Sequence, residues 1–163
     1  MTPSPMLLSM LRLSLTPGLG PVLTTRAIAA MGSPEAVLSA NEHALMRIRG
    51  IGADKARAIC SGIAASAALA DTELALAESL GVTMLALGEP EYPALLAQIP
   101  NPPLVLYIRG KLDAANRDRY GVAIVGSREC STYGLEQAGR FSTALAQAGM
   151  CIVSGGARGI DTA

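Results

Sequence analysis

Two short apolar runs with a helical pattern between them dominate the carboxyl-terminal part of the chain. Residues 122–125 and 151–153 contain no charged side chain and are rich in β-branched residues, which is typical of central strands in a parallel sheet. Between the runs, apolar side chains recur at steps of three or four and then meet a glycine, at Leu135, Ala138, Phe141, Leu145, Ala148 and Gly149. The pattern predicts a βαβ unit with a right-handed crossover.

Helical periodicity dominates the first 68 residues, where helix-breaking and capping residues separate the apolar stretches. Small residues at 64–70 predict a helix end or a hinge. Two further strands are predicted at residues 82–87 and 104–109. The chain is therefore predicted to be α/β, with a helical domain at residues 1–68 followed by the start of a Rossmann-like parallel sheet at residues 69–163.

Two glycine-containing turns lie between predicted helices of the helical domain. Gly50-Ile51-Gly52 resembles the turn of a helix-hairpin-helix, and residues 17–20 look like a weaker first copy. In this SAM-like arrangement, exposed turn amides bind a backbone phosphate with the help of basic neighbours. Gly50, Gly52, Lys55 and Arg57 are therefore candidates for a secondary DNA contact. Paired hairpins also serve as plain packing modules or protein-contact domains, and we prefer that interpretation here.

The composition indicates a folded chain without an overall basic surface. Half of the 163 residues are hydrophobic, and the formal net charge is zero. A sizeable core is therefore expected, and a uniformly basic coat for nucleic acid is excluded. The first 69 residues carry six basic and three acidic side chains, and the remainder carry seven and ten. Any nucleic-acid contact in the second half must depend on the local placement of cations.

The cysteines and the single histidine do not predict a metal site. The three cysteines show no CxxC spacing, and no second histidine is present. An odd number of thiols without a disulfide framework indicates reduced cysteines and a cytoplasmic protein. Arg12 interrupts the first apolar run, so neither a signal peptide nor a membrane span is predicted. No metal ion and no cofactor are expected.

Each strand of the predicted βαβ unit ends in a glycine-bearing loop with one arginine. In an open α/β sheet, ligands bind at the carboxyl ends of the strands. Gly126 favours close approach of a ligand to the backbone, Ser127 adds a hydroxyl, and Arg128 adds a bidentate cation. Gly155 and Gly156 leave amides uncovered ahead of a predicted helix start. The pattern predicts a phosphate-bearing ligand; the alternative is that the glycines only let the chain pass from strand to helix.

These loops also resemble a known family. Val125-Gly-Ser-Arg with Ser131 and Tyr133-Gly134, and then Ser154-Gly-Gly-Ala-Arg-Gly-Ile-Asp, closely resemble the DNA-processing protein A family (DprA, also called Smf). The segment upstream of the loops resembles the same family at Tyr92-Pro93, Leu95-Leu96, Pro102-Pro103, Leu106-Tyr107 and Arg109-Gly110. Gly156 stands where the family more often has Leu or Met. The family continues well beyond the position of Ala163, so the chain resembles a truncated, amino-terminal portion.

The resemblance implies an extended Rossmann-like fold and a role in DNA processing. Proteins of this family bind single-stranded DNA, load the recombinase RecA onto it in natural transformation, and dimerise through the Rossmann domain. Carried over residue by residue, the resemblance implies that Gly126, Ser127 and Arg128 hold the DNA backbone, with Gly155 and Gly156 beside them. The expected partners are single-stranded DNA, RecA and a second copy of the full-length protein.

No catalytic constellation accompanies the two loops. Ser127 and Ser154 have no histidine base nearby in the sequence, and Asp161 has no second carboxylate. The chain is therefore not expected to be an enzyme. The alternatives are a nucleotide-binding or nucleotide-hydrolysing Rossmann-like enzyme, whose second loop cradles a nucleoside phosphate, and a non-functional remnant. Residues 1–68 are expected to fold cooperatively, whereas residues 122–163 are expected to open easily.

Overall fold

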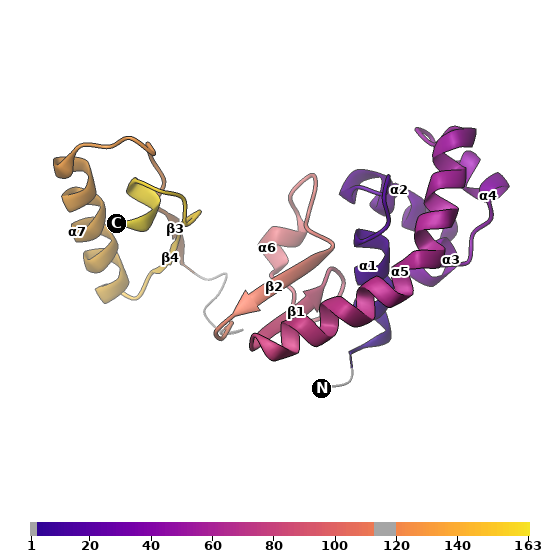
Figure 1. Ribbon diagram of the computed structural model, residues 1–163. Helices are drawn as coiled ribbons and strands as arrows, with labels where there is room; N and C mark the ends of the chain where they lie inside the picture. Colours follow the sequence, from indigo (N-terminus) through magenta and orange to yellow (C-terminus); the bar gives the residue numbers. More distant parts are fainter. Residues whose placement is uncertain (1–2, 113–119) are drawn as a thin grey trace. The chain divides into compact units, whose positions relative to one another are not determined.

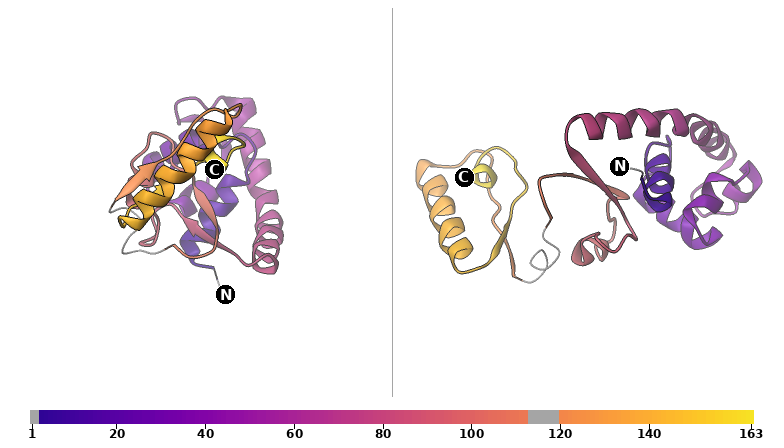
Figure 2. Two further views of the ribbon diagram at one scale, coloured as in Figure 1. Left: turned by 90° about the vertical axis from the view of Figure 1, so that its left-hand side faces the viewer. Right: turned by 90° about the horizontal axis from the view of Figure 1, so that it is seen from below.

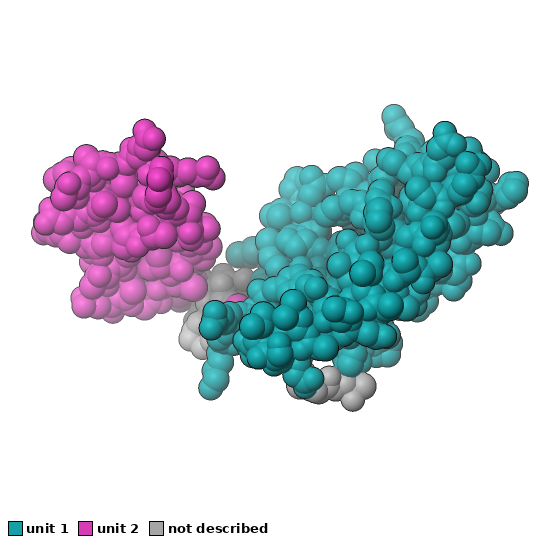
Figure 3. Space-filling model, in the orientation of Figure 1, with its two compact units in different colours: residues 1–111 teal, residues 112–163 magenta. Residues whose placement is uncertain are grey.

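A computed structural model describes residues 3–112 and 120–163 of the chain (Figure 1). The chain divides into two compact units, Met1–Lys111 and Leu112–Ala163 (Figure 3), which we call the first unit and the second unit. The elements of the first unit are α1 (Pro5–Ser14), α2 (Pro21–Met31), α3 (Pro34–Leu38), α4 (Glu42–Met46), α5 (Ala53–Ser79), β1 (Val82–Ala86), α6 (Ala94–Ala97) and β2 (Val105–Arg109). Those of the second unit are β3 (Gly121–Ala123), α7 (Thr132–Gln147), β4 (Cys151–Val153) and the 3₁₀ turn η1 (Ile160–Thr162).

Side-chain caps set the beginnings of three helices in the first unit. The Ser4 hydroxyl accepts the backbone N–H of Leu7 at the start of α1, at 2.9 Å. Ser33 caps α3 and Asn41 caps α4 in the same way, each through the N–H three residues later. These residues satisfy amides that a helix start would otherwise leave without partners. The capping residues visible in the sequence thus mark where the helices begin.

Two turns of matching geometry divide the helical part into a tandem of helix-hairpin-helix motifs. Gly18 lies between α1 and α2 with φ +86°, and Gly50 lies between α4 and α5 with φ +98°. The residue after each glycine donates its N–H to a carbonyl three positions back, at 3.1 Å in both turns. Leu19 and Ile51 are also both buried. The weaker copy seen in the sequence is therefore confirmed as the same turn.

Helix α5 is continuous over its 27 residues. The hinge expected at residues 64–70 was wrong, because alanine has the highest helix propensity and neither glycine nor proline follows Gly62 in this helix. The predicted domain boundary between residues 68 and 69 therefore falls inside α5, whereas the compact units divide after Lys111. The division at residue 68 remains a prediction.

By length and composition alone, α5 is apolar enough to cross a membrane. Six of its side chains are buried against the rest of the first unit, at Ala56, Ile59, Ile63, Ser66, Ala70 and Ala77. Arg12 of α1 donates to the Ser66 hydroxyl and to the carbonyl of Ile63. Core helices of soluble proteins can be equally long and apolar, so a single such helix is weak evidence for a membrane span.

Strands β1 and β2 form an antiparallel pair that packs on α1 and α5 (Figure 2). The Glu89 carboxylate connects the pair to the start of α1, because it accepts both the Ser4 hydroxyl and the backbone N–H of Ala86. The buried Tyr92 donates its hydroxyl to the carbonyl of Pro103 at 2.8 Å. These contacts explain why the two strands belong to the helical unit in space.

The second unit is the predicted βαβ unit. Strands β3 and β4 pair in parallel, with Gly121 opposite Cys151 and Ala123 opposite Val153, and α7 connects them. The ladder extends one step beyond β3, since the N–H of Ile124 donates to the carbonyl of Val153. With the helix-hairpin-helix tandem, this gives an α/β chain in which a helical module precedes a Rossmann-like parallel pair.

Helix α7 buries only part of its predicted apolar face. Ala138 is buried and Leu145 is partly buried, whereas Leu135, Phe141 and Ala148 are exposed. Helix α7 contacts β4 and η1, and the small residue Gly134 lies against Ile160 of η1. Periodicity correctly predicted the helix here, but it did not predict which apolar side chains are covered.

Candidate nucleic-acid interface

The candidate site consists of two loops that leave the same edge of the β3–β4 pair. The first loop, residues 124–131, follows β3, and the second loop, residues 154–159, follows β4. Because the strands are parallel neighbours, both loops begin at their carboxyl ends. The structure therefore brings Gly126, Ser127 and Arg128 into the same part of the second unit as Gly155 and Gly156.

Backbone and side-chain hydrogen bonds join the two loops. The Gly126 N–H donates to Asp161 Oδ1 at 3.1 Å, and the Ile160 N–H donates to the carbonyl of Ser127 at 3.2 Å. The Ser154 hydroxyl lies 2.8 Å from the carbonyl oxygen of Ile124 and 3.0 Å from that of Asp161. The segment around η1 thus holds the first loop in one conformation.

Three of the loop glycines are needed for close packing between the loops. A Cβ atom on Gly126 would lie 2.7 Å from Ile160 Cγ1, and one on Gly155 would lie 2.7 Å from Asp161 Oδ2. On Gly159, whose φ is +100°, a Cβ would lie 2.2 Å from the carbonyl oxygen of Ser127. Gly126 and Gly155 therefore allow the two loops to pack closely against each other.

Gly156 differs from the other glycines of the site. It has a φ of +63°, and no heavy atom lies within 4 Å of the position of an added Cβ. The helix start expected after it is the single 3₁₀ turn η1. Of the glycines in the second loop, Gly156 alone thus has open space beside it.

The cations of the site face solvent. Arg128 and Arg158 are both exposed, and within the described part of the chain neither guanidinium makes a hydrogen bond or an ion pair. The Ser127 hydroxyl donates to the carbonyl of Glu129 at 2.8 Å and accepts the Glu129 N–H at 3.1 Å, which shapes the turn that carries Arg128. Two unpaired guanidiniums on adjoining loops are suited to bind phosphate oxygens in pairs.

Two residues outside the predicted site set belong to the site, and only the first of them was recognisable from the sequence. Arg158 belongs to the same Ser-Gly-Gly-Ala-Arg-Gly run as Gly155 and Gly156, and an arginine in a glycine-rich loop is itself a signal for anion binding. Asp161 ends that run, but its contact with Gly126 spans 35 positions of the sequence. Such a contact depends on the pairing of the strands, so local pattern does not reveal it.

The secondary candidates lie in the hairpin between α4 and α5 of the first unit. Gly50 has the positive φ of the turn, whereas Gly52 is the N-cap of α5 with φ −89° and no side-chain cap. Lys55 is exposed, and Arg57 lies 3.5 Å from Asp54, a spacing that makes an exposed ion pair. A further cation lies at this turn: Arg26 Nη1 donates to the carbonyl of Arg49 at 2.6 Å. The sequence did not reveal this contact, because the two residues are 23 positions apart.

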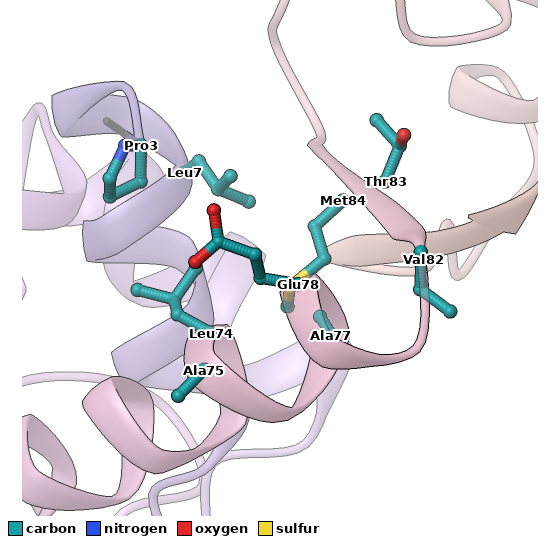
Figure 4. Close-up of a pocket in the computed structure, with 10 residues that line it drawn as sticks. Pro3, Leu7, Leu74, Ala75, Ala77, Glu78, Val82, Thr83 and Met84 are labelled. Carbon is teal, nitrogen blue, oxygen red and sulfur yellow. The ribbon is translucent and has the colours of Figure 1, made fainter. Parts of the chain in front are cut away.

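A hollow of about 470 Å³ lies elsewhere in the first unit (Figure 4). Its lining comes from α1, the end of α5 and β1, and includes Leu7, Leu74, Val82 and Met84. The lining contains the carboxylate of Glu78 and no basic side chain. This hollow is therefore unsuited to phosphate, and it contains no residue of the predicted site.

Comparison with known proteins matches the two parts of the chain separately. Residues 83–163 match the model of the family described as DNA recombination-mediator protein A, and residues 9–65 match that of the SAM-like helix-hairpin-helix tandem. The chain is 45% identical over 75 residues to Protein Smf of Synechocystis sp., an alignment that covers 45% of this chain and 19% of that protein. It is 32% identical over 88 residues to DNA processing protein DprA of Bacillus subtilis, covering 54% of this chain and 29% of that protein.

A third relative extends this pattern. The chain is 39% identical over 75 residues to Protein Smf of Borreliella burgdorferi, covering 46% of this chain and 23% of that protein. The aligned part therefore spans less than a third of the length of each of these three relatives. The family match includes all of β1 but its first residue, β2 and the whole of the two-loop site. On the strength of these matches, the chain belongs to the DNA recombination-mediator protein A family, whose members bear the names DprA and Smf.

Proposed function

We propose that this chain takes part in DNA processing by binding the phosphodiester backbone of single-stranded DNA at the two-loop site. Arg128 is the principal phosphate ligand, Arg158 adds a second cation, and the exposed Gly156 borders the path of the strand. In the whole protein, this binding would protect incoming DNA during transformation and present it to the recombinase RecA. The partners are thus single-stranded DNA, RecA and a second copy of the protein, in the cytoplasm.

One observation supports this proposal most strongly. Arg128 and Arg158 project from adjoining loops at the carboxyl edge of a parallel strand pair, exposed and without a protein partner among the described residues. An exposed guanidinium with no ion pair is available to a phosphate in bidentate geometry. Because the second half of the chain carries more acidic than basic residues, binding there depends on these particular cations and not on the overall field.

The same geometry favours a polynucleotide over a mononucleotide. A nucleoside-phosphate site of the Rossmann type uses free loop amides and an α-helix N-terminus. Here the Gly126 amide is already bonded to Asp161. The enzyme alternative needs a free acid–base pair beside the glycines. The carboxylate of Asp161 already accepts a backbone N–H. Binding without turnover is therefore our proposal.

Fluorescence anisotropy with the 163-residue chain tests this function. The titration compares a labelled oligo-dT, a duplex of equal length and a labelled mononucleotide. We expect the oligo-dT to bind most tightly, and Arg128→Ala to weaken its binding while Arg128→Lys restores only part of it. Arg140→Ala is the matched control, because Arg140 is an exposed arginine on α7. Tight mononucleotide binding with little affinity for oligo-dT would support the enzyme alternative instead.

A further inference from the structure

The Asp161 carboxylate contacts both loops of the site. Its Oδ1 accepts the Gly126 N–H at 3.1 Å. Its Oδ2 lies so close to Gly155 that an added Cβ there would be 2.7 Å away. The carboxylate therefore lies between the two loops, in a space that exists because Gly155 has no side chain.

The neighbours of Asp161 contact the remaining backbone of the first loop. The Ile160 side chain covers Gly126, and the Ile160 N–H donates to the carbonyl of Ser127. Gly159 is packed so tightly that a Cβ on it would lie 2.7 Å from Arg128 Cα. Residues 159–161 thus touch the backbone at each position of Gly126-Ser127-Arg128. The direction in which Arg128 leaves the loop depends on these contacts.

We propose that Asp161 is a positioning residue for Arg128. By holding the Gly126 amide, its carboxylate fixes the backbone that carries the guanidinium and aims the guanidinium at a phosphodiester. This inference rests on the proposed function, because it concerns binding at the same site. The second loop then acts as the support of the first loop and not as an independent anion cradle.

The proposal and simple electrostatics predict opposite changes in DNA affinity when the Asp161 carboxylate is removed. A carboxylate beside a phosphate site repels the ligand, so removing it should strengthen binding if charge alone mattered. If Asp161 positions Arg128, Asp161→Ala should instead weaken oligo-dT binding by about threefold to tenfold, as expected for one disrupted charge-assisted contact. Asp161→Asn keeps an oxygen that accepts the Gly126 N–H and removes the charge. It should therefore bind as tightly as the wild type or more tightly.

A double-mutant comparison of Asp161 and Arg128 gives a second test of the proposal. The double variant Asp161→Ala/Arg128→Ala should bind no more weakly than Arg128→Ala, since both changes remove the same contact. Gly155→Ala should reproduce the effect of Asp161→Ala by displacing the carboxylate. Circular dichroism of each variant separates lost binding from lost folding, and Asp161→Asn serves as the folded comparison. The proposal would be overturned by Asp161→Ala binding as tightly as the wild type, or by strictly additive losses in the double variant.

Amide hydrogen exchange keeps this inference separate from the function on which it rests. The Gly126 amide should exchange faster in Asp161→Ala than in the wild type, and at the wild-type rate in Asp161→Asn. If the wild type binds no oligo-dT, the proposed function fails, while the exchange rates still report whether Asp161 holds the first loop. An unchanged Gly126 exchange rate in Asp161→Ala contradicts the positioning role whatever the DNA titration shows.

Discussion

The two units of the chain are stabilised in different ways. Twenty of the 21 buried hydrophobic side chains among the described residues lie in the first unit, including the fully buried Leu11, Leu13 and Leu45. In the second unit only Ala138 joins them, whereas Val125, Phe141 and Val153 are each more than half exposed. The first unit is thus held by a hydrophobic core, which is the main source of folding free energy.

The second unit keeps its site in place through contacts between loops. Hydrogen bonds from Gly126 and Ile160, and glycine positions without room for a Cβ, fix the first loop against the second. Such contacts fix geometry, but they bury little apolar surface and so contribute less to unfolding free energy. We infer that global stability and ligand geometry depend on different parts of this chain, and that substitutions should separate them.

The largest expected effect is loss of a core side chain in the first unit. Leu11→Ala should lower the free energy of unfolding by about 2–5 kcal/mol, because Leu11 is fully buried on α1, a helix that contacts α3, α5 and β1. Phe141→Ala in the second unit is the matched change, and it should cost less than about 0.5 kcal/mol because Phe141 is 61% exposed. Urea unfolding followed by circular dichroism and segment-resolved hydrogen exchange measures both. Similar losses in the two variants would refute the contrast.

Replacing glycines of the second unit by alanine should change stability in opposite directions, depending on the space around each glycine. Gly126→Ala forces a methyl group against Ile160 and should destabilise the loops by about 1–3 kcal/mol. Gly139→Ala should stabilise α7 by about 0.5–1 kcal/mol, since Gly139 lies inside that helix with nothing within 4 Å of an added Cβ. Hydrogen exchange of the second unit reports both. If Gly126→Ala is tolerated without change, the loops are not held by close packing.

The two glycines of the second hairpin should also respond differently. Gly50→Ala should cost about 1–2 kcal/mol because Gly50 has a φ of +98°, and its added methyl would lie 3.3 Å from Arg26 Nη1. Gly52→Ala should cost less, since Gly52 has a negative φ and no heavy atom within 4 Å of the added Cβ. Thermal unfolding of the two variants measures the difference. Equal costs would mean that backbone conformation does not distinguish these positions.

The smallest effect concerns the pH dependence of the first unit. Burial, together with a hydrogen bond to Glu73 and its charge, raises the pKa of Tyr107 to about 12. Folding therefore favours the neutral phenol, and this contribution is present below about pH 10 and is lost as the pH rises toward about 12. Because the side chain is half exposed, solvent screening should keep the effect below about 1 kcal/mol. Absorbance titration of the phenolate, with Tyr107→Phe as the reference, measures it; loss of the most alkaline ionisation is expected.

Local chemistry explains which parts of this fold were predictable from sequence. Capping residues such as Ser33 and Asn41 act over three positions, so they mark helix starts reliably. The glycine turns at Gly18 and Gly50 and the βαβ pattern were recognisable for the same reason. The prediction of a hinge at residues 64–70 was wrong, because this alanine-rich run favours a continuous helix.

The parts that were not predictable depend on contacts between distant residues. The position of the β1–β2 pair on the helical unit depends on Glu89 meeting Ser4, 85 positions away in the sequence. The role of Gly126 likewise follows from Ile160 and Asp161, which reach it only after β3 and β4 pair. The sequence marked Gly126 as important, and the structure adds that it packs against Ile160 within the protein.

The salt dependence of DNA binding distinguishes the two units most directly. Oligo-dT affinity should be measured at several salt concentrations for the wild type, for Arg128→Ala and for Lys55→Ala/Arg57→Ala. We predict that Arg128→Ala lowers the salt slope by roughly 0.7, the value for one lost contact with a single-strand phosphate, whatever the base sequence. The double variant of the hairpin should keep both the wild-type slope and the wild-type affinity. An unchanged slope in Arg128→Ala, together with a marked loss in a folded Lys55→Ala/Arg57→Ala variant, would place the DNA contact in the first unit and contradict the proposed site.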